Sequence, residues 1–147
     1  LKKQYKNAMK KAGKDVDIAG ERDHKGADFL SGNGEKVYAV TSGKISYNWG
    51  GESGGFTATL VGDNGYTFIY KHLERNTRLE GKTYRVNAGR SIAKSSNTGA
   101  VQKLGGADSG YHLHLELTKN NSSERIMDWE VWRSIFIGAE FKSDSAE

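Results

Sequence analysis

The chain has 147 residues, which suits one globular domain with a single hydrophobic core. Hydrophobic residues make up 35% of it and charged residues 27%, a balance that excludes a disordered chain, and no apolar run approaches the roughly 20 residues of a membrane-spanning helix. The absence of cysteine excludes a disulfide framework and a thiolate metal site, while the formal net charge of +4 leaves anionic partners open.

The first predicted element is a helix over residues 1–12. Leu1, Tyr5, Met9 and Ala12 recur at helical spacing, and Gly13 is a suitable end. Much of the positive charge lies in residues 1–14, in Lys2, Lys3, Lys6, Lys10, Lys11 and Lys14. Such a basic segment attracts anionic polymers, or it is the solvated face of a helix. Because the chain begins with Leu instead of Met, we expect a part of a longer chain or a processed form.

Short apolar or alternating segments follow, each bounded by turn residues. They predict strands over residues 36–40, 44–49, 56–61, 66–72, 91–94 and 111–117. Asn64-Gly65 predicts a hairpin turn with positive φ at both positions, and residues 50–55 predict a mobile loop without regular structure. The 19 glycines agree with many tight connections. The sequence therefore predicts a mainly β fold, an antiparallel sheet or a small barrel.

The last predicted element is a short amphipathic helix. Its apolar positions are Ile126, Trp129, Val131, Trp132 and Ile135, and Gly138 is a suitable end. We expect aromatic residues of this segment, Trp129, Trp132 and Phe136, to dock it on the core. The other notable aromatic residues either pack in the core or line a substrate groove: Tyr38, Tyr47, Trp49 and Tyr111.

Three of the four histidines lie in two compact motifs. His24 and Asp28 form an H-x3-D pattern, and His112-Leu113-His114 lies in a predicted strand. Side chains alternate across a strand, so His112, His114 and Glu116 share one face while the intervening leucines share the other. Two imidazoles on one rigid strand are arranged for metal binding or for acid–base chemistry.

A catalytic zinc site uses three protein ligands, and two histidines with one aspartate make such a set. The remaining histidines are then available as a base and as a group that stabilises an oxyanion. Each residue also has a simpler interpretation. Asp28 is then a turn residue, and the histidines are solvated or structural. Asp23 is the nearest alternative to Asp28 as a carboxylate ligand. Glu116 either holds a ligand imidazole or is exposed.

The ordered motifs resemble those of the M23 metallopeptidases, the lysostaphin and LytM-type cell-wall endopeptidases. The H-x3-D and H-L-H motifs flank the sequence Tyr70-Lys71-His72-Leu73, which matches the family's Y-x-H-L motif. Residues 37–45 resemble a V-x-A-x-x-x-G-x-V hairpin of the family, and residues 86–92 resemble its V-x-x-G-x-x-I segment. The family's Thr-Gly turn is present at residues 98–99, but a longer loop, residues 100–110, separates it from the H-L-H motif.

The resemblance implies a site and an activity. His24, Asp28 and His114 would bind Zn²⁺, His112 would act as the general base, and His72 would polarise the scissile carbonyl or stabilise the oxyanion. The fold would be an antiparallel, barrel-like sheet with an open groove and short flanking helices. We expect a helical lead-in over residues 1–20, a peptidase core over residues 21–118 and a helical C-terminal extension over residues 119–147.

The function implied is zinc-dependent hydrolysis of peptidoglycan stem or cross-bridge peptides. It implies a location in the cell wall, outside the cell or in the periplasm, or in a phage tail. Anionic wall polymers are candidate partners of the basic N-terminus, and we expect no nucleic-acid partner. A non-catalytic wall-binding module of the same fold is the alternative, although such proteins usually lose ligands or catalytic histidines that this chain keeps. A nucleic-acid-binding barrel leaves the order of the histidines unexplained.

Overall fold

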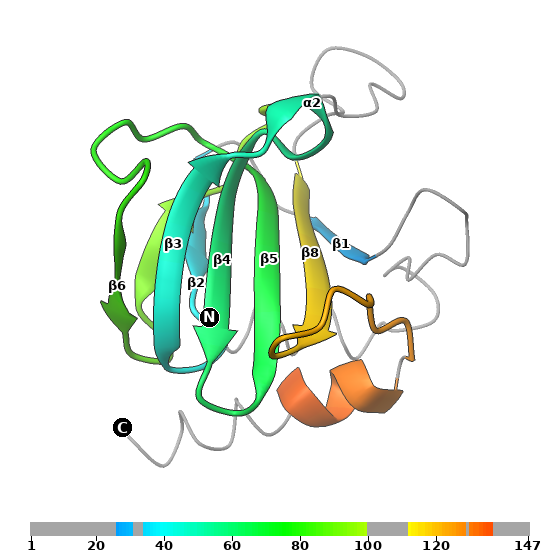
Figure 1. The fold of residues 1–147 in the computed structure, drawn as a ribbon. Helices are drawn as coiled ribbons and strands as arrows, with labels where there is room; N and C mark the ends of the chain where they lie inside the picture. Colours follow the sequence, from blue (N-terminus) through cyan, green and yellow to red (C-terminus); the bar gives the residue numbers. More distant parts are fainter. Residues whose placement is uncertain (1–25, 31–33, 100–111, 129, 137–147) are drawn as a thin grey trace.

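The fold is an antiparallel sheet with a smaller sheet against one face. The computed structural model describes residues 26–30, 34–99, 112–128 and 130–136, without the side chains of residues 28–30 and 112. A six-stranded sheet has the order β1-β8-β5-β4-β3-β6, and β2 pairs with β7 in a second sheet (Figure 1). The strand bounds are β1 Ala27–Leu30, β2 Lys36–Tyr38, β3 Gly43–Trp49, β4 Phe56–Gly62, β5 Tyr66–Leu73, β6 Thr83–Val86, β7 Ser91–Lys94 and β8 His112–Lys119.

All six predicted strands are present, and two further strands were not predicted. β6 has three exposed residues out of four, so it carries no apolar alternation. β1 has only four residues and depends on its pairing with β8, whose partner residues lie 82 to 88 positions later in the chain. Pairing with neighbouring strands therefore stabilises β1 and β6, although their local sequences do not favour a strand.

The antiparallel sheet is confirmed, but the barrel is not. The large sheet is open, with β1 and β6 at its edges. The family-like hairpin expected over residues 37–45 is wrong as a pairing, because β2 pairs with β7 while β3 pairs with β4 and β6. The chain therefore passes from one sheet to the other between Tyr38 and Gly43.

Two glycine-containing turns also differ from expectation. Residues 50–55 were predicted as an irregular loop, yet Gly51–Gly54 forms one helical turn, α2, closed by a 2.8 Å hydrogen bond from Gly55 N to Gly51 O. The paired ends of β3 and β4 hold this turn on both sides. The hairpin at Asn64-Gly65 is confirmed, but only Gly65 has positive φ, because the loop between β4 and β5 has three residues.

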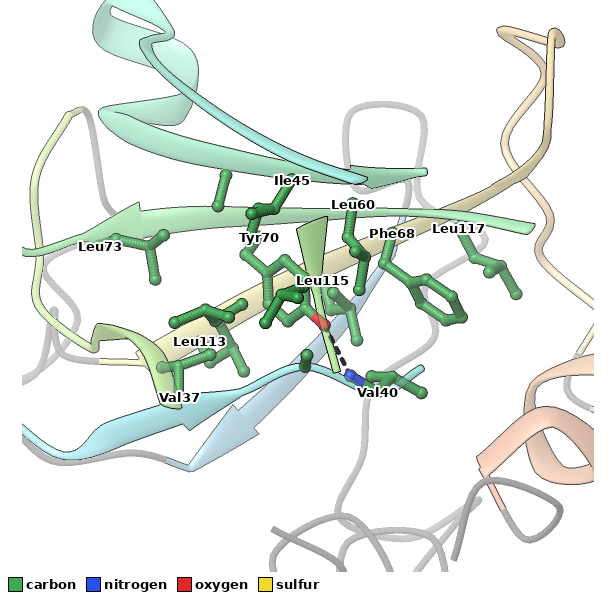
Figure 2. Close-up of a cluster of buried hydrophobic side chains, with 14 of the residues drawn as sticks. Val37, Val40, Ile45, Leu60, Phe68, Tyr70, Leu73, Leu113, Leu115 and Leu117 are labelled. Carbon is green, nitrogen blue, oxygen red and sulfur yellow. Dashed lines mark hydrogen bonds between the residues drawn. The ribbon is translucent and has the colours of Figure 1, made fainter. Parts of the chain in front are cut away.

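The core lies between the two sheets. Its largest fully buried side chains come mainly from the inner faces of β3, β4, β5 and β8, and many of them are shown in Figure 2. Val40 N donates to the hydroxyl of Tyr70 at 3.1 Å, and the hydroxyl of Tyr47 donates to Ile92 O at 2.7 Å. These two buried tyrosines thus join the large sheet to the segment after β2 and to β7.

A helix over residues 130–136 closes one end of the core. Trp132 is fully buried and stacks on Phe136, and the ring of Phe136 meets Phe68 of β5 edge-on. Docking through Trp132 and Phe136 is thereby confirmed. Trp129, Gly138 and the predicted helix over residues 1–12 lie outside the described residues. No helix within the described ranges is long and apolar enough to cross a membrane.

Candidate functional site

Three motifs that are far apart in the sequence lie on three neighbouring strands. Asp28 of β1 lies directly opposite His114 of β8, and Lys71 of β5 lies opposite His114 on the other side. Positions paired in this way occupy the same face of a sheet. The register therefore brings the described end of the H-x3-D motif beside the H-L-H and Y-x-H-L motifs. His24 lies outside the described residues, and Asp28 and His112 are described in their backbone only.

Strand β8 separates the core from this candidate site. Leu113, Leu115 and Leu117 are fully buried in the core, as the alternation predicted. His114 and Glu116 on the opposite face are also buried, at 7% and 5% exposure. A solvated imidazole is therefore excluded for His114, and Glu116 is not an exposed carboxylate.

Glu116 is the centre of a buried charged cluster. Its carboxylate accepts hydrogen bonds from His114 Nε2 at 2.9 Å and Arg125 Nε at 2.5 Å, and it lies 2.8 Å from Lys71 Nζ. Burial raises the pKa of Glu116, but the bonds from His114, Lys71 and Arg125 outweigh it and lower the pKa to about 2. The group is therefore a carboxylate at neutral pH.

This contact fixes which nitrogen of His114 carries the proton. A carboxylate only accepts hydrogen bonds, so His114 Nε2 must be the donor. In the neutral ring the lone pair then lies on Nδ1, the form in which imidazole binds a metal. A histidine whose second nitrogen donates to a carboxylate is the usual arrangement of zinc ligands, so the donor chemistry of His114 fits zinc.

The complete ligand set is only partly described. Among the residues whose side chains the structure describes, no group of three His, Cys, Asp or Glu is placed to hold a metal. Of the three predicted ligands, only His114 has a described side chain. The backbone register that pairs Asp28 with His114 supports the predicted set.

His72 lies at the end of β5, beside His114. Its ring centroid is 6.0 Å from that of His114, and it is only 6% exposed. Its backbone φ is +61°, a left-handed conformation that is costly for a non-glycine residue. The ring Nδ1 lies 2.8 Å from the carbonyl oxygen of Thr98. The structure thus brings His72 to the site, in a strained conformation typical of functional positions.

The sequence did not single out the residues that support these histidines. Lys71 and Arg125 hold Glu116, and Thr98 contacts His72. Lys71 lies inside the Y-x-H-L motif, but its role follows from cross-strand register, which a single sequence does not give. Arg125 comes from a loop and carries no local signal, whereas Thr98 belongs to the Thr-Gly turn noted in the sequence, which gave it no role in the site.

The expected groove-lining aromatics have different environments. Tyr47 is fully buried in the core, and Tyr38 is half-buried at the end of β2. Trp49 is 43% exposed, and the guanidinium of Arg75 lies 4.9 Å from its ring centroid. Tyr111 lies outside the described residues. Of the described three, only Trp49 is an exposed aromatic.

Comparison with known proteins identifies the family. The profile of Peptidase family M23 matches residues 22–125, which contain all the candidate site residues. The chain belongs to Peptidase family M23. No curated protein sequence matches this M23 chain.

Solved structures have the same fold. The catalytic domain of lysostaphin from Staphylococcus simulans is 31% identical, with a TM-score of 0.54, and the match covers 68% of this chain and 70% of that one. LytU is 36% identical with a TM-score of 0.55, covering 68% of this chain and 64% of that one. A zinc-containing peptidase from Vibrio cholerae is 27% identical with a TM-score of 0.54, and the match covers 71% of this M23 chain but only 30% of that protein.

Proposed function

We propose that the chain is a zinc-dependent endopeptidase that hydrolyses peptide bonds in peptidoglycan stem or cross-bridge peptides. One observation carries the proposal. The sheet pairs Asp28 with His114 and brings His72 to 6.0 Å from the ring of His114, so described residues from each of the three motifs lie close together in a chain of a peptidase family. The solved relatives include an antimicrobial peptidase and a zinc-containing peptidase, which supports the same activity here.

The metal would be held by His24, Asp28 and His114. Zinc bound there would supply Lewis-acid catalysis and would make hydroxide available near neutral pH. The chain's own contribution at this position is to fix the ring of His114. Glu116 accepts its Nε2 hydrogen and so presents Nδ1 as the donor atom.

The other two histidines would act on protons and charge. His112 lies two positions before His114 on β8 and is proposed as the base that accepts a proton from the attacking water. His72 is proposed to stabilise the developing oxyanion of the scissile carbonyl. Because Nδ1 of His72 donates to a carbonyl oxygen, the ring would meet substrate through Nε2, which donates to an oxyanion only when the ring carries both protons.

Metal analysis and kinetics test this proposal together. The purified chain should bind about one zinc, and His114→Ala should lose most of it, because the set has only three protein ligands. His72→Ala should keep its zinc while kcat falls about 100- to 1,000-fold. Undiminished zinc in His114→Ala would remove the ligand assignment. Zinc binding without hydrolysis by the wild-type chain would favour the non-catalytic wall-binding module instead.

The substrate and the location belong to the same proposal. Peptidoglycan lies outside the cytoplasmic membrane, so the chain would act in the cell wall or periplasm, or as part of a phage particle. The basic residues between Lys2 and Lys14 would add attraction to anionic wall polymers. Mass spectrometry of the fragments released from purified walls of several bacterial types would identify the bond that is cut. Release of glycan fragments without peptide cleavage would contradict the proposal.

A further inference from the structure

Thr98 connects three parts of the chain through its own atoms. Its hydroxyl donates to Leu73 O at the end of β5 and accepts from Phe56 N at the start of β4, at 3.1 Å. Its carbonyl oxygen accepts from His72 Nδ1 at 2.8 Å. One residue thus joins the start of β4 and the end of β5 to the ring of His72, which is itself a residue of β5.

Two glycines make room for this residue. A Cβ at Gly55 would overlap the carbonyl group of Thr98, and a Cβ at Gly99 would lie 2.5 Å from Gly55 N. Both glycines have positive φ, +64° and +79°, which only glycine adopts at little cost. The backbone around Thr98 is therefore packed at a distance that side chains would prevent.

The backbone of His72 is held from the same side. Ser96 N donates to His72 O at 3.0 Å, and Glu74 N donates to Lys94 O at 2.8 Å. Residues 94–98 thus run beside residues 72–74, which pair with them at an isolated bridge between Leu73 and Ser95. A strained φ of +61° persists only where the surroundings determine it, and these contacts do so.

We propose that Thr98 is a positioning residue for His72, because its carbonyl oxygen orients the ring and fixes the Nδ1–H form. The hydroxyl holds that carbonyl in place by tying it to β4 and β5. A carbonyl oxygen cannot donate, so the proton must lie on Nδ1 of the ring. The inference deepens the proposed function and rests on it for the claim that orienting His72 affects turnover.

The wild-type chain gives the first test. Two-bond ¹⁵N–¹H spectra distinguish the ring tautomers, and the signals of His72 among the four histidines are found by their loss in His72→Gln. Neutral His72 should be in the Nδ1–H form, with and without added zinc. A dominant Nε2–H form would overturn the proposal without any variant of Thr98.

The second test compares variants that remove or keep the hydroxyl. Thr98→Val has nearly the same shape and loses the hydroxyl, whereas Thr98→Ser keeps it. Thr98→Val should mix the tautomers of His72 and lower kcat about ten- to a hundred-fold with little change in KM or zinc content. Thr98→Ser should stay near wild type.

Thr67→Val is the matched control. The hydroxyl of Thr67 donates to Asn120 Oδ1 at 2.7 Å, at the opposite end of β5 from His72. Thr67→Val should keep kcat and the tautomer of His72. Equal losses of kcat in Thr67→Val and Thr98→Val, or wild-type kcat in Thr98→Val while His72→Ala is impaired, would overturn the positioning role. A different result would contradict the proposed catalytic role of His72 and not the positioning by Thr98. It is wild-type kcat in His72→Ala, together with the Nδ1–H form of His72 in the wild-type chain.

Discussion

Glu116→Ala offers the sharpest test of the buried charged cluster. The wild-type carboxylate is 5% exposed and is contacted by three positive or donor groups, from His114, Lys71 and Arg125. Removing one member of a buried ionic network typically costs about 3–5 kcal/mol, because its partners are left uncompensated. Here the side chains of Lys71 and Arg125 are 20% and 25% exposed, so water can partly solvate them. We therefore expect the lower end, a loss of about 3 kcal/mol in the free energy of unfolding.

Urea denaturation in the presence of a chelator measures this loss without a contribution from bound metal. Glu116→Gln is the matched control, because its amide oxygen still accepts the Nε2 hydrogen of His114 but its negative charge is gone. It should lose less stability than the alanine variant. A free energy of unfolding for Glu116→Ala within about 0.5 kcal/mol of wild type, the range of ordinary surface substitutions, would refute the importance of the cluster.

Three further predictions concern other parts of the molecule. His112→Ala should retain zinc but lose about 100- to 10,000-fold in turnover, by metal analysis and peptide cleavage; loss of metal here, with retention in His114→Ala, would reverse the two roles. Burial raises the pKa of Tyr47 and Tyr70, so both hydroxyls stay protonated in the folded state. The free energy of unfolding should therefore fall as pH rises above about 10, where the tyrosines of the unfolded chain ionise. Absorbance at 295 nm should show both ionising only on unfolding; their titration in the folded chain near pH 10 would contradict this. Gly55→Ala should be destabilised by more than about 1 kcal/mol in urea, because its φ is +64° and the new Cβ meets Thr98; unchanged stability would show that the backbone yields.

The sequence predicted the parts of this fold that have a local hydrophobic pattern or a motif. Alternation on β8 identified both its core face and its polar face, and the order of the histidine motifs identified the family. β6 was missed because its residues are mostly exposed, and the helical turn at Gly51–Gly54 was missed because glycine disfavours helix locally. There the ends of β3 and β4 impose the structure.

The supporting residues of the site could not be predicted for a different reason. The sequence left two roles for Glu116, an exposed carboxylate or a partner that orients a histidine. The choice depends on contacts with Arg125, which comes from a loop, and with Lys71 of the neighbouring strand. The left-handed φ of His72 likewise has no local sequence signal, because only a small fraction of non-glycine residues adopt it. Contacts between distant segments decide both cases.

The place of β8 in the sheet has a consequence for the order of events during translation. Asp28 lies on β1, an edge strand whose pairing partner is β8, the last strand among the described residues. The early half of the candidate metal site therefore has no neighbour to pair with until the ribosome has released residues 112–119. A nascent chain would carry all of β2 to β7 and still lack an assembled site. The strand that completes the sheet would therefore also be the one that completes the candidate site.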